Sequence, residues 1–177
     1  MKIILIALLL STSLLGQGQQ LSQEEQSLYN LIMQYRKTKN LPPIPLSPSL
    51  TIVAQTHAHD LADNNPDQGR CNLHSWSNKG SWSACCYTDD HAKAQCMWDK
   101  PSELTSYKSN GYEISAWSSD DISASKALDL WKSSPGHHAV IINSGIWNSS
   151  WQAIGIGIYG GYALVWFGNE PDSQSKK

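Results

Sequence analysis

The chain has 177 residues, with 13 lysines and arginines against 15 aspartates and glutamates, a formal net charge of −2. This balance lacks the basic surface that nucleic-acid binding needs, so we predict no nucleic-acid partner. Eight tryptophans and seven tyrosines stand against one phenylalanine. Most aromatic rings therefore carry a polar atom, which suits half-buried walls and clefts. The length fits one domain with its own core.

The first 18 residues have the pattern of a secretory leader. Lys2 precedes an apolar run over 3–10, and small residues follow up to Gly18. The run is short for a bilayer span, so we predict a signal peptide over 1–18 and no integral membrane segment. We expect a monomer that is secreted, or periplasmic in a Gram-negative bacterium.

All four cysteines lie close together, at Cys71, Cys85, Cys86 and Cys96. In an exported protein the default interpretation is two disulfides. A bond between the adjacent Cys85 and Cys86 would need a strained ring, so each is expected to pair with Cys71 or Cys96, in an order that the sequence leaves open. The alternative is a zinc site made by these thiols with His91, although the spacing lacks C-x-x-C pairs.

An amphipathic helix is predicted at the start of the mature chain. Ser22 followed by Glu25 has the form of a capping box. Apolar residues at helical spacing come next, which predicts a helix over 24–37. Three prolines within 42–45 cannot donate to a helix and end it.

A second helix follows, capped by Ser47 with Pro48 in its first turn. His57 lies on its apolar stripe, and we expect a packed, hydrogen-bonded histidine there. The residues over 64–67 end this helix.

The stretch over 68–110 shows no regular period apart from a short helix expected around 91–98. Such long loops are usually functional or stapled. Its tryptophans are expected to seal the segment, with a carbohydrate platform as the alternative: Trp76, Trp82 and Trp98. His91 is expected to be a solvated loop residue.

A strand over 112–117 and a third helix capped by Ser123 come next, and Ser134-Pro135-Gly136 is expected to stop that helix. Strand patterns over 153–159 and 162–167 are joined by Gly160-Gly161, which signals a hairpin.

In the first of these two strands Gly155 and Gly157 alternate with isoleucines, so a helix or another backbone must approach its bare face. The tail from Asn169 is polar and expected to fray. Helices first and a closing hairpin last favour an α+β fold.

Three ionisable residues stand at the ends of predicted elements: His74, Glu113 and His137. Two histidines and a carboxylate suit a divalent transition metal such as zinc, with water in the open position. They suit general acid–base chemistry equally well. Each could also be a hydrogen-bonded structural residue.

These residues lie within recognisable motifs. The order is His74-Ser75, then G-x-E-x-x-A-W over 111–117, W-x-x-S-P-G-H over 131–137 and a glycine-alternating strand over 153–158. In this order the sequence resembles the CAP superfamily, which includes cysteine-rich secretory proteins, insect venom antigen 5 and plant pathogenesis-related proteins. It is most similar to the bacterial secreted members, and the resemblance covers roughly 24–167.

The resemblance implies a three-layer α-β-α sandwich with a C-terminal antiparallel hairpin. It places a single CAP-like domain over 22–168 and a polar tail over 169–177. It also implies a central cavity with two histidines and two acids that can hold zinc. His74, Glu113 and His137 match three of these positions, and no acid stands at the fourth. His138 replaces the family's arginine and is expected to be either a cavity partner or exposed.

Three functions follow from this resemblance and these residues. The first is a secreted, disulfide-stapled domain that binds a weakly held divalent metal, a lipid, a glycan or a protein partner at the cavity of His74, Glu113 and His137. The second is a metal-dependent hydrolase with Glu113 as the base. The third is a structural extracellular module. The missing fourth acid favours binding over catalysis.

Overall fold

The computed structural model describes residues 20–175, and the predicted signal peptide over 1–18 lies outside them. The helices are α1 (Gln23–Thr38), α2 (Pro48–Asn64), α3 (Ala94–Trp98), α4 (Lys100–Leu104), α5 (Ala124–Ser133) and α6 (Pro135–Ile141), with a 3₁₀ turn at Gly145–Trp147. The strands are β1 (Gly111–Trp117), β2 (Ala153–Tyr159) and β3 (Tyr162–Gly168). None of the helices within 20–175 is long and apolar enough to cross a membrane.

The three strands form one antiparallel sheet in the order β1-β3-β2. The predicted hairpin is present, with both Gly160 and Gly161 at positive φ. Directly opposed residues share a face of the sheet. One face therefore carries four transverse rows: Gly111–Gly168–Ala153, Glu113–Trp166–Gly155, Ser115–Leu164–Gly157 and Trp117–Tyr162–Tyr159.

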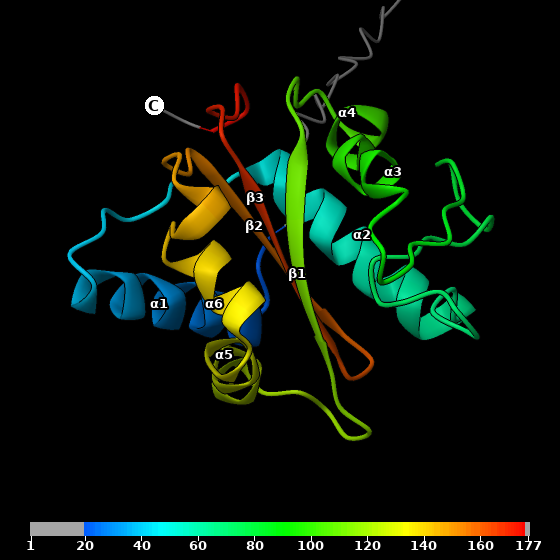
Figure 1. Ribbon diagram of the computed structural model, residues 1–177, viewed down its shortest axis with the longest axis horizontal. Coiled ribbons are helices and arrows are strands. Elements are labelled where there is room, and N and C mark those ends of the chain that lie inside the picture. Colours follow the sequence, from blue (N-terminus) through cyan, green and yellow to red (C-terminus); the bar gives the residue numbers. More distant parts are fainter. Residues whose placement is uncertain (1–19, 176–177) are drawn as a thin grey trace, which may run out of the picture.

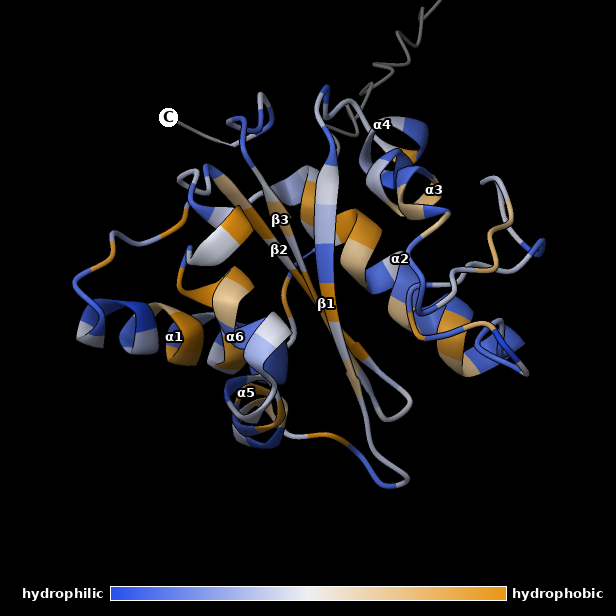
Figure 2. Ribbon diagram, in the orientation of Figure 1, coloured by the Kyte–Doolittle hydropathy of each residue, from blue (hydrophilic) through white to orange (hydrophobic). Residues whose placement is uncertain are grey.

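Helices cover both faces of this sheet, as the predicted three-layer sandwich requires (Figure 1). Helices α1, α5 and α6 lie on one side. Helix α2 lies on the other side with the cysteine-containing stretch over 68–110, called the stapled segment below, which includes α3 and α4. Apolar residues gather on β2, β3 and the helix faces turned toward them (Figure 2). Burial of these faces is the main source of stability of such a layered fold.

The glycines of β2 allow α2 to pack directly on the sheet. A Cβ atom built on Gly155 would overlap the backbone of Leu50, and one on Gly157 would overlap the backbone of Ala54. The predicted close approach is therefore made by α2. The side chains on this face of α2 consequently lie close to the middle of the sheet.

Local signals placed most helix ends correctly. Ser22 and Glu25 form the capping box of α1, and the Ser47 hydroxyl accepts the amide hydrogen of Leu50 at the start of α2. The predicted stop at Ser134-Pro135-Gly136 is confirmed, because α5 ends at Ser133, but a new helix that was not predicted, α6, begins at once. The amide hydrogens in the first turn of a helix have no partner inside the helix. Proline, which has no amide hydrogen, can therefore start a helix as well as end one.

The C-terminal segment also differs from its prediction. Instead of fraying, it returns to the first turn of α2. The Asp172 carboxylate is buried and accepts hydrogen bonds from the Ser47 hydroxyl at 2.6 Å and the Ser49 amide at 2.8 Å. A carboxylate at a helix N-terminus is favoured by the free amides and the helix dipole.

Candidate functional site

The site is built around Glu113, the third residue of β1, on the face of the sheet that α2 covers. Its side chain is fully buried and has no contact with solvent. One carboxylate oxygen accepts a hydrogen bond from Nδ1 of His57 on α2, and the other accepts one from Nδ1 of His74, both at 2.6 Å. Glu113 thus joins a helix histidine to a histidine of the stapled segment.

His57 has hydrogen-bond acceptors at both ring nitrogens. Its Nδ1 faces the Glu113 carboxylate, and its Nε2 lies 2.8 Å from the carbonyl oxygen of Ser75. A carbonyl can only accept, and an ionised carboxylate can only accept, so both ring nitrogens donate. With an ionised Glu113, the ring therefore has the hydrogen-bond geometry of an imidazolium paired with a carboxylate.

Two observations agree with this charge assignment. The His57 ring stacks on Trp76 with centroids 4.0 Å apart and 9° between the planes, a contact that favours a cation over an aromatic face. Burial alone would raise the pKa of Glu113, but the charge of His57 and hydrogen bonds from His57 and His74 hold that pKa below its ordinary value. Glu113 is consequently ionised at neutral pH.

His74 uses only one nitrogen in this network. When the ring is neutral, donation from Nδ1–H to Glu113 leaves the lone pair on Nε2. The side chain is 16 % exposed, and its ring lies edge-on to Tyr87 with centroids 5.2 Å apart. The carboxylate behind the ring therefore fixes which nitrogen can bind a ligand.

His137 enters the same cavity from α6. Burial lowers its pKa, a protonated His74 nearby would lower it further, and Glu113 opposes this change. The ring is therefore neutral at neutral pH and can act as a nitrogen ligand.

The cavity has a volume of about 500 Å³ and lies between the stapled segment and α6. Its histidines and glutamate occupy part of the lining, and most of the rest is apolar. The lining comprises His74, Tyr87, His91, Ala94, Met97, Trp98, Tyr112, Glu113, Ile114, Ser134, Gly136, His137, Val140, Ile146 and Trp147. A pocket of this size and composition suits a small ligand with a polar group and an apolar part.

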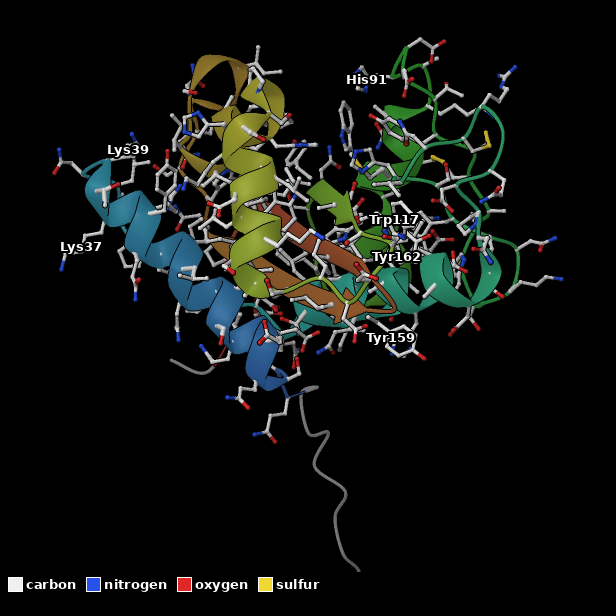
Figure 3. The ribbon with its side chains drawn as sticks, turned by 90° about the horizontal axis from the view of Figure 1, so that it is seen from below. Lys37, Lys39, His91, Trp117, Tyr159 and Tyr162 are labelled. Atoms are coloured by element: carbon white, nitrogen blue, oxygen red, sulfur yellow. A yellow bond between two sulfur atoms is a disulfide. The ribbon has the colours of Figure 1, made fainter. Side chains whose placement is uncertain are left out.

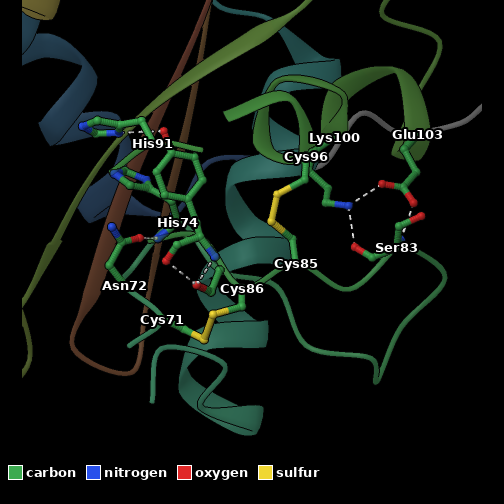
Figure 4. Close-up of a disulfide and its surroundings, with 12 residues drawn as sticks. Cys71, Asn72, His74, Ser83, Cys85, Cys86, His91, Cys96, Lys100 and Glu103 are labelled. Atoms are coloured by element: carbon green, nitrogen blue, oxygen red, sulfur yellow. Dashed lines mark hydrogen bonds and ion pairs between the residues drawn. A yellow bond between two sulfur atoms is a disulfide. The ribbon is translucent and has the colours of Figure 1, made fainter. Parts of the chain in front are cut away.

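The two disulfides hold one wall of this cavity. They join Cys71 to Cys86 and Cys85 to Cys96, which settles the pairing that the sequence left open and excludes the thiol zinc site. Figure 4 shows both bonds beside His74. The first bond holds Cys86, the residue before Tyr87. The second holds Cys96 in the middle of α3, the helix that supplies Met97 and Trp98 to the wall.

Several other predictions can be compared with this geometry. His57 is packed and hydrogen-bonded as expected, and Trp76 is buried beneath the stapled segment as expected. His138 points to α1, where its Nε2 lies 2.8 Å from the Tyr35 hydroxyl, so it is not a cavity partner. His91 is exposed but also lines the cavity, and its Nδ1 lies 3.0 Å from the Tyr87 hydroxyl.

The three predicted site residues meet at one cavity without forming a closed metal centre. Within 20–175 no group of three or more histidine, cysteine, aspartate or glutamate side chains is arranged to hold a metal ion. Both oxygens of Glu113 face histidines. Of the three predicted residues, His74 and His137 are therefore left as donors toward the cavity, which His91 also lines.

Comparison with known proteins identifies the family. Residues 29–166, most of the chain, match the family described as the cysteine-rich secretory protein family, CAP. The chain belongs to the CAP family. Comparison of the sequence with curated proteins gives no match.

Solved structures share the CAP fold at low sequence identity. An outer surface protein from Borrelia burgdorferi has a TM-score of 0.57 at 19 % identity, covering 84 % of this chain and 94 % of the other. A cysteine-rich secretory protein from Staphylococcus aureus has 0.54 at 16 %, covering 83 % and 38 %. An extracellular protein containing an SCP domain from Bacillus anthracis has 0.57 at 18 %, covering 83 % and 40 %. At these identities the likeness concerns the fold alone.

Proposed function

We propose that this CAP domain acts by binding, and that its cavity takes a divalent transition metal such as zinc through His74 and His137. The observation that carries this proposal is the hydrogen bond from Nδ1 of His74 to Glu113. It leaves Nε2 of His74 as the free nitrogen in a cavity that His137 also lines. The bound metal would attract an oxygen of an extracellular ligand as a Lewis acid.

The donor set fits this role chemically. Histidines that bind metals commonly donate their second nitrogen to a carboxylate, which fixes the ring and raises its basicity. His137 supplies a second imidazole in its neutral form, the form that binds metal. Two protein ligands leave several positions for water, so we expect weak and exchangeable binding.

The position of Glu113 supports binding rather than hydrolysis. A general base must reach the proton of an attacking water. Both oxygens of Glu113 already accept histidine hydrogens in a fully buried place. Its role in the proposal is therefore to orient His74 and to balance the charge of His57.

Export of the chain is part of the same proposal. Two disulfides within one segment form and persist in oxidising compartments. The predicted leader has the same implication, and the named relatives are an outer surface, a secretory and an extracellular protein. The ligand that meets the metal would then be an extracellular lipid, glycan or protein.

Calorimetric titration of the oxidised mature protein with zinc chloride tests the metal site. We expect one-to-one binding at about pH 7.5 that weakens at about pH 5.5, because protonated imidazoles cannot bind zinc. His74→Ala and His137→Ala should each abolish the signal. His59→Ala is the matched control, since that side chain is 52 % exposed on the outer part of α2.

Two results would contradict the proposal. Zinc binding that survives both His74→Ala and His137→Ala would place the metal elsewhere. A wild-type protein that binds no zinc, with variants that only lose stability, would make these histidines structural.

A further inference from the structure

A row of aromatic side chains lies across one end of the sheet, far from the cavity. Trp117, Tyr162 and Tyr159 are directly opposed on β1, β3 and β2, and Figure 3 shows their rings one after another across the sheet. Trp117 is four residues beyond Glu113 on β1, about 13 Å along the strand. The aromatic row is therefore a separate surface from the metal site.

The two outer rings of the aromatic row are open to solvent. Trp117 is 53 % exposed and Tyr159 is 42 % exposed, while Tyr162 between them is buried. Within 20–175 only four large hydrophobic side chains are exposed, and these two belong to one row. Exposed apolar groups that gather in one place, unlike single scattered ones, mark interaction surfaces.

The rings are held in place by their neighbours. The His59 ring stacks on Tyr159 with centroids 3.6 Å apart, and Trp117 lies 6.4 Å from Tyr162. The Tyr162 hydroxyl donates to the Asp67 carboxylate at 3.5 Å. A surface whose rings are already fixed loses little entropy when it binds a ligand.

Acidic and amide groups border the aromatic row. The Asp63 carboxylate lies 3.6 Å from Nδ1 of His59, and the Asp67 carboxylate accepts from the Tyr162 hydroxyl. Two shallow depressions of about 390 and about 320 Å³ flank His59, and Gln55 lines both. Lys126 donates to the Ser118 hydroxyl at 2.6 Å.

We propose that the aromatic row binds a neutral glycan. The face of an aromatic ring carries negative charge and attracts the C–H groups on the flat side of a sugar ring. Carboxylates and amides beside the rings can accept hydrogen bonds from sugar hydroxyls. The acidic border repels sulfated or phosphorylated polymers and anionic lipids. Two strand spacings span about 10 Å, enough for successive sugars of one chain.

The test uses the oxidised mature protein and a panel of neutral oligosaccharides, including tetramers of β-1,4-linked N-acetylglucosamine and of β-1,4-linked glucose. Binding is followed by tryptophan fluorescence and by saturation-transfer NMR. Trp117→Ala and Tyr159→Ala should each weaken binding about tenfold or more, which is the loss of one stacking contact. Trp117→Phe keeps a ring and should retain most of the affinity.

Leu130→Ala is the matched control, because Leu130 is an equally exposed apolar residue on α5. It should leave binding unchanged. Thermal melting of each variant shows that the fold is intact, which these exposed positions should allow. Zinc titration of Trp117→Ala should match that of the wild type, so this proposal and the metal site can fail separately.

Three outcomes would overturn the proposal. The first is a wild-type protein that binds no member of the neutral panel. The second is binding that persists in both alanine variants. The third is concentration-dependent self-association in sedimentation that Trp117→Ala abolishes, since the aromatic row would then be a protein interface.

Discussion

Removal of the Glu113 carboxylate should cost the protein much of its stability. In Glu113→Ala the His57 imidazolium stays buried, without its counter-charge and with one N–H unpaired. Removal of one partner from a buried ion pair typically costs about 3–5 kcal/mol. The His74 ring loses its hydrogen bond as well, so we expect a value in the upper part of that range.

Glu113→Gln should be milder because it allows the network to rearrange. The amide oxygen can accept from His74, and the amide nitrogen can donate to Nδ1 of His57 once that ring loses a proton. The bond from His57 to the Ser75 carbonyl is then kept. We expect a cost of about 1–2 kcal/mol, the range of a rearranged hydrogen bond.

Urea unfolding at neutral pH with intact disulfides measures both costs. A cycle with His57→Phe, which keeps a ring against Trp76, should show strong coupling with Glu113→Ala. Asp129→Ala removes a carboxylate that is 72 % exposed and should change stability by less than about 0.5 kcal/mol. A cost below about 1 kcal/mol for Glu113→Ala, or additive effects in the cycle, would refute the buried ion pair.

Three further predictions follow from the same structure. Because the pKa of Glu113 is lowered in the folded state, its stabilising effect is present above its unfolded pKa and is lost as the pH falls through the folded pKa. Unfolding free energy should therefore fall as the pH drops below the ordinary glutamate pKa of about 4.3, and Glu113→Gln should flatten that fall; parallel profiles would contradict this. Gly155→Ala should cost about 3 kcal/mol in the same urea assay, because the methyl group overlaps the Leu50 backbone; a neutral effect would mean that α2 packs less closely. Asp172→Ala should cost about 2 kcal/mol by removing acceptors at the first turn of α2, whereas unchanged melting would mean that the tail does not dock there.

Much of the fold could be predicted because its signals are local. Capping residues and prolines mark helix ends through a few neighbouring backbone groups, and Gly160-Gly161 supplies the positive φ that a tight hairpin needs. The glycine alternation at Gly155 also predicted a close neighbour correctly. Helix α4 was missed because five residues are too few to show a helical period.

The candidate site was only partly predictable from the sequence. His74, Glu113 and His137 could be chosen by motif, and they do share one cavity. The pairing of Glu113 with His57 could not be predicted, because it depends on the position at which α2 packs along the sheet. The disulfide order and the docking of Asp172 are tertiary contacts too, and no local pattern specifies them.

Long-range ¹H–¹⁵N NMR of the histidine rings measures the protonation of His57 and His74, because nitrogen shifts report which ring nitrogens carry hydrogen. We predict that His57 is protonated on both nitrogens and His74 on Nδ1 alone at neutral pH. Addition of zinc should move the signals of Nε2 of His74 and of one nitrogen of His137, and leave those of His57 in place. A neutral His57, or a His74 protonated on Nε2, would contradict the proposed network, as would zinc shifts at other histidines.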